Sequence, residues 1–256
     1  MRSRLARWKN DIIARIPAAL HPEVVPTPLP PTAWAPTDAS VGVLAWYRAD
    51  LGVTAPAGVV SNVADQTGTD ANKHLVNSGV VTVAADAAYG GREVFTHATA
   101  SLKRPGPWAV AAAPPLTIVF VGNNDGGGYN SSFVSSGPTA NLLWAQTSLA
   151  IEWYPGGPHL VASATSPSVI MYSDEGGVAA DAAKLYVDNL STPALTGLAA
   201  ATSDFGFDIG EASSGIGSLT GRCAEVIIFG GILTPTDVAN LKTYLNTTRA
   251  YGIAVT

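Results

Sequence analysis

The sequence predicts an all-β protein of the sandwich class. Only 13% of its 256 residues are charged, whereas it contains 26 glycines and 18 prolines, a composition typical of short strands joined by many turns. Apolar runs of strand length alternate with clusters of turn-forming residues along most of the chain. A chain of this length fits one large sandwich, because all-β sandwiches of this size are commonly single domains.

The first twenty residues, 1–20, are predicted to form a basic amphipathic helix that attaches the protein to a partner. Its apolar stripe consists of Leu5, Trp8, Ile12 and Ile16, and Pro17 ends it. The segment has five basic residues and one acidic residue, although the formal net charge of the whole chain is −5. A helix this short is marginal in water and must be stabilised by docking. Docking to a partner or to copies of itself is favoured over an acidic membrane surface, and a targeting sequence is favoured least.

Residues 21–40 are predicted to be a proline-rich linker arm. Six prolines lie between His21 and Thr37, which favours an extended, semi-rigid spacer. The alternative is a strap that packs along the domain with Trp34 as its anchor. The sandwich domain is assigned to residues 41–256.

Strands are predicted wherever an apolar run is bounded by turn residues. The strongest runs are 116–121 and 223–229. Both faces of the second run are largely apolar, so this strand should be covered on both sides. The predicted strands are 43–48, 58–63, 92–96, 100–104, 116–122, 131–135, 141–146, 149–154, 159–163, 168–172, 183–188, 204–210 and 222–229.

A short closing helix is predicted after the last strand. Thr234 can cap its first turn, Pro235 takes the first helical position, and Asp237 completes a capping box. Leu233 and Val238 are placed to pack across this turn. The stripe expected to face the sheet comprises Val238, Leu241 and Leu245, and the residues expected to point away are Asn240, Lys242 and Asn246.

Several stretches also carry a family resemblance. They are VLAWYRADLGVT at 43–54, VSNVADQTGTDANKHLVNSG at 60–79, and the ending AEVIIF, LTPTD and LKTYLNTTRAYGI. They resemble laminin-G-like, concanavalin-A-like jelly-roll domains over roughly residues 41 to 252, although Ala64 stands where the family often has Trp and Thr67 where it has Ser. The resemblance implies a jelly-roll sandwich. It leaves the activity open, since this architecture hosts lectins, glycosidases, adhesins and virion proteins.

Composition and motifs argue against several functions. The body has no basic patch of the kind that binds nucleic acid. No segment is predicted to span a membrane, and Asp11 and Arg15 interrupt the one stretch that could be the core of a signal peptide. The single cysteine, Cys223, lies in an apolar strand and is predicted to be a buried small hydrophobe.

An enzymatic function is not predicted. Glycosidases of this architecture need two carboxylates that meet across the sugar, and none of the six glutamates lies in a motif that would provide such a pair. No catalytic residue is therefore assigned.

Calcium is the one cofactor that the sequence leaves open. Asp65 and Asp70 lie in one polar loop, and Asn123 and Asp125 lie in another, so both loops offer the oxygen ligands that calcium prefers. The alternative is the ordinary chemistry of tight turns, in which Asp and Asn beside Gly are common.

Aromatic residues near turns are candidates for sugar binding. Trp153 and Tyr154 precede a Pro-Gly-Gly turn, and Trp108 lies in another Pro-containing segment. Such rings could stack on the apolar face of a sugar, whereas the alternative is that they fill the core of the sandwich.

The function predicted from these features is that of a non-enzymatic structural or adhesive protein displayed on a large assembly. A bacteriophage virion is favoured, with residues 1–37 docking to capsid or tail proteins, the protein forming a homo-oligomer, and the sandwich exposed on the virion surface toward a possible host glycan. The main alternative is a carbohydrate-binding module of a bacterial surface or secreted protein, and a glycan-degrading enzyme ranks third.

Overall fold

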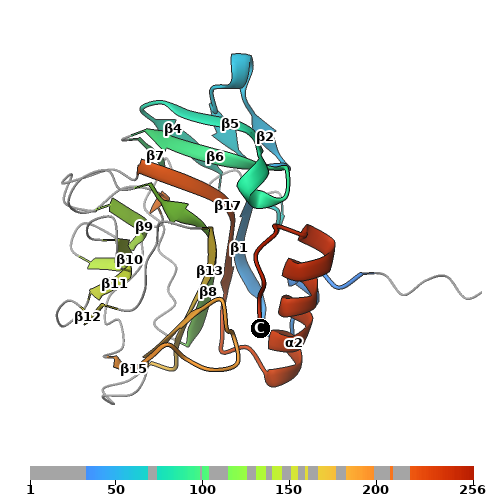
Figure 1. The fold of residues 1–256 in the computed structure, drawn as a ribbon, viewed down its shortest axis with the longest axis vertical. Helices are drawn as coiled ribbons and strands as arrows, with labels where there is room; N and C mark the ends of the chain where they lie inside the picture. Colours follow the sequence, from blue (N-terminus) through green and yellow to red (C-terminus); the bar gives the residue numbers. More distant parts are fainter. Residues whose placement is uncertain are drawn as a thin grey trace, which may run out of the picture. The chain divides into compact units, whose positions relative to one another are not determined.

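The computed structural model describes residues 33–68, 74–98, 100–103, 115–125, 131–136, 140–145, 151–154, 159–160, 167–176, 183–198, 208–209 and 220–256, with the backbone alone for the four strands between 131 and 160. These residues form antiparallel sheets with one short C-terminal helix (Figure 1). The predicted all-β sandwich is confirmed.

The first sheet, sheet A, has the strand order β15-β14-β13-β8-β17-β6-β5, and β1 also pairs with β17. Its strands are β1 (Val43–Arg48), β5 (Val81–Asp86), β6 (Arg92–Ala98), β8 (Leu116–Asn124), β13 (Ser168–Asp174), β14 (Ala183–Val187), β15 (Leu195–Leu198) and β17 (Thr220–Phe229).

The second sheet, sheet B, has the strand order β12-β11-β10-β9-β16-β7-β4-β3-β2. Its strands are β2 (Val53–Thr54), β3 (Asn62–Val63), β4 (Leu75–Ser78), β7 (Ser101–Lys103), β9 (Ser131–Ser136), β10 (Ala140–Ala145), β11 (Ile151–Tyr154), β12 (His159–Leu160) and β16 (Asp208–Ile209).

The helix α2 (Pro235–Thr243) begins as the sequence predicts. Thr234 is its N-cap, and the side chain of Asp237 accepts a hydrogen bond from the backbone N–H of Thr234, which completes the capping box. The helix continues into a π-helical segment, Tyr244–Arg249, that the sequence did not predict. Short 3-10 helices cover Pro36–Asp38, Pro56–Gly58 and Ala87–Tyr89.

Most strand predictions agree with the structure to within a few residues, but four short or weakly patterned strands were missed. β2, β4, β5 and β15 have no counterpart among the predicted strands. β5 reads Val-Thr-Val-Ala-Ala-Asp, and Ala and Asp are depleted in strands, so its conformation depends on pairing with β6 along its whole length. The predicted strand 58–63 is found only at Asn62–Val63, since Gly58 ends a 3-10 helix and Val59 forms only an isolated bridge with Thr82.

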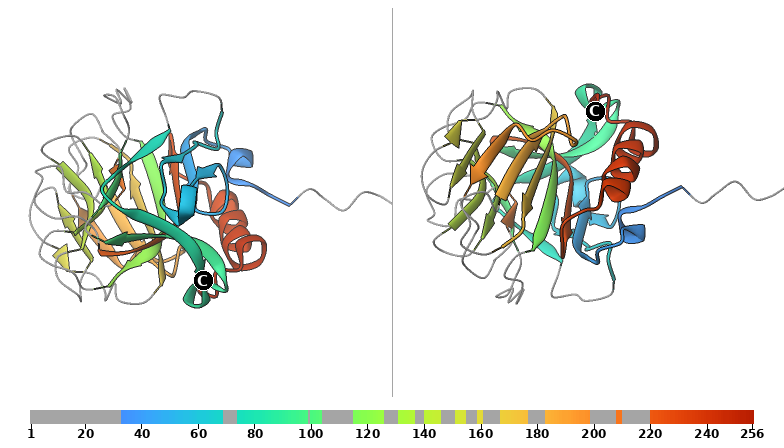
Figure 2. Two further views of the ribbon diagram at one scale, coloured as in Figure 1. Left: turned by 90° about the horizontal axis from the view of Figure 1, so that it is seen from above. Right: turned by 90° about the horizontal axis from the view of Figure 1, so that it is seen from below.

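β17 lies at the centre of sheet A and is covered on both sides, as predicted. Val226 and Ile228 enter the core between the two sheets, whereas Ile227 and Phe229 face the core beneath α2. Figure 2 shows α2 on the outer face of sheet A, on the side away from β9–β12. Cys223 is fully buried and its burial raises the pKa of its thiol, which confirms the predicted role as a small hydrophobe.

The pairing of β8 with β17 requires glycine at two positions. A Cβ atom added to Gly221 would lie 2.2 Å from the backbone oxygen of Asn123. One added to Gly122 would lie 2.3 Å from the ring of Phe120 and 2.4 Å from the backbone oxygen of Arg222. Because these contacts involve the backbone, a larger residue could be accommodated only by displacing one strand.

The first described residues pack on α2 and on the π-helical segment that follows it. The ring of Trp34 makes an edge contact with Tyr244 at a centroid distance of 5.9 Å. The Ser40 backbone N–H donates to Asp237 Oδ1 at 3.0 Å, and the Ser40 hydroxyl donates to the same carboxylate. Residues 33–40 thus contact the domain in the way expected of a strap anchored by Trp34, and the compact unit that contains the sandwich begins at Ala33.

No helix in the part of the chain that the structure describes is long and apolar enough to cross a membrane.

Candidate functional site

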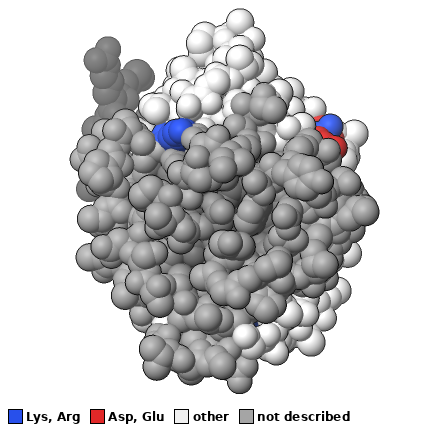
Figure 3. Space-filling view, turned by 90° about the vertical axis from the view of Figure 1, so that its left-hand side faces the viewer, with Lys and Arg blue, Asp and Glu red and all other residues white. Residues whose placement is uncertain are grey.

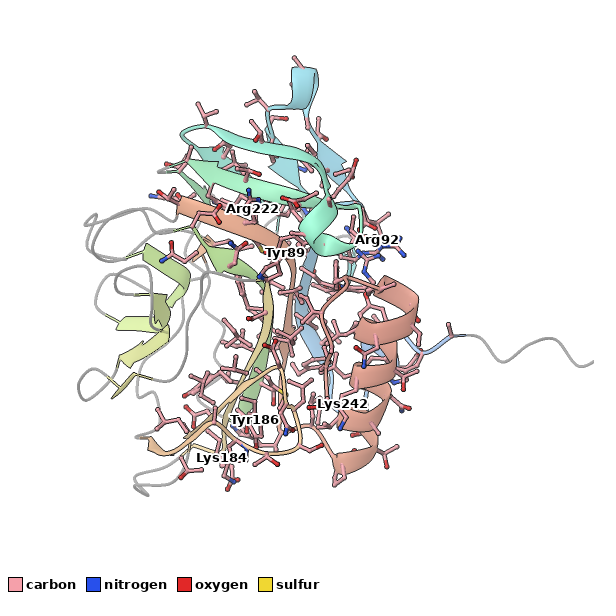
Figure 4. The ribbon with its side chains drawn as sticks, in the orientation of Figure 1. Tyr89, Arg92, Lys184, Tyr186, Arg222 and Lys242 are labelled. Atoms are coloured by element: carbon pink, nitrogen blue, oxygen red, sulfur yellow. The ribbon has the colours of Figure 1, made fainter. Side chains whose placement is uncertain are left out.

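An open groove of about 320 Å³ lies between α2 and the edge of sheet A. We call it the Tyr186–Lys242 groove, and its lining residues are Tyr186, Leu190, Ser191, Leu233, Pro235, Val238, Ala239 and Lys242. Tyr186 of β14 and Lys242 of α2 lie on the two elements that border it (Figure 4). Its volume falls at the lower end of the range typical of sites for small ligands.

One wall of the groove comes from β14 and the loop that follows it. Leu185 is buried in the inter-sheet core, so the alternation of the strand directs the partly exposed Tyr186 to the outer face. The loop after β14 is fixed by Asp188, whose carboxylate accepts a hydrogen bond from the Val169 N–H at 2.7 Å. The Leu190 N–H donates to the backbone oxygen of Thr256 at 2.7 Å, which holds the loop against the C-terminus.

The other wall is the face of α2 that carries Pro235, Val238, Ala239 and Lys242. These positions are three or four residues apart and therefore line one side of a helix. The sequence predicted that Lys242 points away from the domain. Instead its ammonium group donates to the Ser191 hydroxyl at 2.7 Å and spans one end of the groove.

A smaller recess of about 50 Å³ shares four lining residues with the groove and extends toward β8 and β13. Thr117, Met171 and Ser173 belong to this recess. The Thr117 hydroxyl donates to the backbone oxygen of Gly231 at 2.8 Å. Ser173 and Tyr186, which both carry a hydroxyl group, line this recess.

The predicted sugar-binding residues lie away from this groove or outside the described residues. Trp153 and Tyr154 lie on β11 of sheet B, where Trp153 pairs with His159 and Tyr154 pairs with Asn141. Their adjacent positions alternate between the two faces of the sheet. Trp108 lies outside the described residues. Figure 3 shows the side of the domain that carries β9–β12, whose side chains are not described.

The predicted calcium ligands fall into two polar clusters that are already hydrogen-bonded within the protein. Asp65 is buried and accepts bonds from the Trp46 N–H at 2.8 Å and from the Thr67 hydroxyl at 2.5 Å. Asp70 lies outside the described residues. Among those described, no group of three His, Cys, Asp or Glu side chains is arranged to hold a metal.

The second predicted calcium loop is occupied by an ion pair. Asn123 accepts a hydrogen bond from the Tyr89 hydroxyl at 2.5 Å and donates to Asp125 at 2.6 Å. Asp125 also binds the Arg222 guanidinium at 2.7 Å, and Arg222 pairs with Asp86 at 2.6 Å. These contacts hold the ends of β5, β8 and β17 together, and they leave calcium binding at this loop a hypothesis.

The predicted docking residues Leu5, Trp8, Ile12 and Ile16 lie outside the described residues, so attachment through residues 1–20 stays a prediction.

A buried network beneath the π-helical segment Tyr244–Arg249 was not predicted. We call it the Glu225–Arg249 network, and its members are Trp46, Asp50, Glu225, Tyr244, Arg249 and Tyr251. Glu225 is fully buried and accepts hydrogen bonds at 2.6 Å from each of Trp46, Tyr244 and Tyr251, and at 3.2 Å from Arg249. Arg249 also forms a two-pronged pair with Asp50, with both distances 2.9 Å.

A bulge in β17 explains how a carboxylate enters an apolar strand. The pairing of β17 with β8 shifts by one residue between Cys223 and Glu225. A bulge of this kind re-aims the side chains of the bulged strand. Ala224 is part of the core beneath α2, and Glu225 is directed to the same side, where Tyr244 and Arg249 bond it.

The charges of this network stabilise one another. Burial alone would raise the pKa of Asp50, but hydrogen bonds from Arg48 and Arg249 lower it to about 2. Burial and the nearby Glu225 raise the pKa of Tyr244 and Tyr251, so both phenols remain protonated donors. Glu225 and Arg249 are buried, so a substrate cannot reach them. The network therefore serves to stabilise the fold.

Known proteins support the fold. Neither a protein-family model nor a curated protein matches the sequence. Domain 4 of AbnA, a GH43 extracellular arabinanase from Geobacillus stearothermophilus solved with arabinotriose, is 13% identical with a TM-score of 0.51, over 78% of this chain and 98% of that domain.

Two sialidase structures from Trypanosoma rangeli are also similar. The complex with sialic acid is 14% identical with a TM-score of 0.50 over 81% of this chain, and the complex with 2,3-difluorosialic acid is 16% identical with a TM-score of 0.52 over 97% of it. The matches cover 33% and 39% of those sialidase chains, respectively. At such low identity the likeness shows a shared fold and no activity.

Proposed function

We propose that this protein binds carbohydrate through the Tyr186–Lys242 groove and does not cleave it. The observation that carries the proposal is the lining of the groove, which combines one aromatic ring, apolar side chains and a few polar groups. Ligand sites typically consist of apolar surface with a small number of placed polar groups. The arabinotriose complex of the similar arabinanase domain supports a sugar as the ligand class.

The groove offers partners both to the apolar face of a sugar ring and to its hydroxyl groups. Its aromatic side chain, Tyr186, offers a flat surface to the C–H groups on one face of the ring. The hydroxyls of Tyr186, Ser173 and Ser191 offer donors and acceptors to the sugar hydroxyls. Leu190 and Leu233 add apolar surface, from which water is readily displaced.

The absence of catalysis is part of the proposal. Glycoside hydrolysis uses two carboxyl groups roughly 5–10 Å apart on either side of the scissile bond. Among the described residues that line the groove and its recess, none is Asp or Glu. Turnover of a glycan that ends on replacement of one carboxylate would favour the alternative of a glycan-degrading enzyme.

Replacing Tyr186 by Ala should weaken glycan binding by about tenfold or more, since about 1.4 kcal/mol of stacking and hydroxyl contact corresponds to a factor of ten. The measurement is binding of the full chain to a glycan array, followed by titration of the best ligand. Tyr186→Phe is the matched control, because it keeps the ring and should retain most of the affinity. Equal binding by the wild type and Tyr186→Ala would exclude this groove.

We further propose that residues 1–32 attach the sandwich to a large assembly such as a bacteriophage virion, with a bacterial surface or secreted protein as the alternative. The support is the basic amphipathic pattern of residues 1–20 and the start of the compact unit at Ala33. The sandwich would then be displayed outward, with its groove available to a surface glycan.

Two truncations test this arrangement. A chain that starts at Ala33 should melt cooperatively at nearly the same temperature as the full chain but should no longer self-associate or join its assembly. A chain that starts at Val41 should melt at a lower temperature, because it also lacks Trp34 and the bonds from Ser40 to Asp237. Light scattering and calorimetry measure both effects. Unchanged association of the Ala33 chain would contradict attachment through residues 1–32.

A further inference from the structure

The charge of the groove is positive and comes from one side chain. Among the described residues that line it, Lys242 is charged and the remaining seven are neutral. The residues that line the adjoining recess are neutral as well. A ligand in this groove therefore meets an ammonium group and no carboxylate from the lining.

The ammonium group of Lys242 has no anionic partner among the described residues. Its hydrogen bond is to the neutral hydroxyl of Ser191, at 2.7 Å. The neighbours of Lys242 one turn away on the helix are Val238, Ala239, Leu245 and Asn246, none of which is acidic. The positive charge is thus held at one end of the groove without being neutralised there.

Lys184 provides a contrast on the same face of sheet A. It lies two residues before Tyr186 on β14, so both side chains point to the outer face (Figure 4). Lys184 pairs with Glu175 at 3.1 Å and does not line the groove. The charge of Lys184 is therefore paired with a carboxylate, whereas the charge of Lys242 meets only a neutral hydroxyl.

We propose that the groove selects sugars that carry a carboxylate, such as sialic or uronic acids, and that Lys242 determines this selectivity. The inference rests on the proposed glycan-binding function and adds the ligand class. With the ring of the sugar against Tyr186, the carboxylate would bind the Lys242 ammonium. Hydrogen bonds between two charged groups are roughly twice as strong as those between neutral groups, so this contact favours acidic sugars over neutral ones.

The test compares sugars that differ in the carboxylate. The full chain is titrated with sialyllactose and lactose, and with trigalacturonate and galactotriose. We expect the wild type to bind the acidic sugar of at least one pair about tenfold more tightly, and this preference to shrink at high salt because ions screen the contact. Lys242→Met should reduce the affinity for the acidic sugar to that for its neutral counterpart. Lys184→Met should change both affinities by less than about twofold.

The possible outcomes separate a failure of the proposed selectivity for acidic sugars from a failure of the proposed glycan binding. Equal binding of acidic and neutral sugars, sensitive to Tyr186→Ala but not to Lys242→Met, would contradict the inference and leave the glycan-binding function intact. A preference for acidic sugars that survives Lys242→Met would also contradict it. Failure of the wild type to bind any saccharide would contradict both proposals. Neither lysine is buried in a core, so both variants should fold. Thermal unfolding of each variant checks that it does.

Discussion

Replacing Arg249 by Met should lower the free energy of unfolding by about 3–5 kcal/mol, the range found when one partner of a buried ion pair is removed. Glu225 would keep its place in the protein interior but lose its cation, and Asp50 would lose a two-pronged partner. Chemical denaturation of the variant measures the loss. The expected effect is larger than that of Arg48→Met, because Arg48 is partly exposed.

The double variant Glu225→Gln with Arg249→Met separates charge from packing. It should recover part of the lost stability, because the oxygen of the neutral amide can accept from one of the two tyrosine hydroxyls and its NH2 group can donate to the other, without burying a charge. An Arg249→Met protein as stable as the wild type would contradict a stabilising role of the network. A double variant less stable than Arg249→Met alone would show that the unpaired buried charge is not the cause of the loss.

Leu241→Ala should lower the free energy of unfolding by about 2–5 kcal/mol, the range for truncating a large aliphatic side chain in a core. Leu241 is fully buried beneath α2, and Leu245 is 1% exposed, so Leu245→Ala should have a similar effect. Lys242→Ala should change stability by about 0.5 kcal/mol or less, because this residue is partly exposed on the adjacent side of the helix. Urea denaturation of the three variants provides the comparison.

Small and equal losses for the three variants would mean that α2 is peripheral to folding. The chain offers an internal check in Leu233, which packs at the start of α2 and is 8% exposed. Leu233→Ala should therefore have an effect in the same direction, and it would also enlarge the groove.

The sequence predicts those parts of the fold that local signals determine. Thr234, Pro235 and Asp237 specify the start of α2 within four residues, and the structure reproduces this start. The run Cys223–Phe229 is apolar on both faces and is found at the centre of sheet A. β5 was missed because Ala and Asp, which make up half of it, are depleted in strands and because its pairing with β6 is a tertiary event.

The candidate site is harder to predict because its parts are distant in the sequence. Tyr186, Ser191 and Lys242 come from a strand, a loop and a helix, and only the packing of α2 on sheet A brings them together. Lys242 carries no sequence signal that distinguishes a groove residue from a solvent-exposed one. Glu225 is a similar case, because its orientation depends on a bulge that the strand pattern does not reveal.

The location of a bound sugar tests the central claim most directly. Backbone amide shifts of the full chain are measured by NMR during titration with the best ligand from the array. Binding in the groove should perturb residues from both walls, above all Tyr186, Leu190, Val238 and Lys242. Shifts confined to β11, around Trp153 and Tyr154, would place the sugar on sheet B and contradict the assignment of the site to the Tyr186–Lys242 groove.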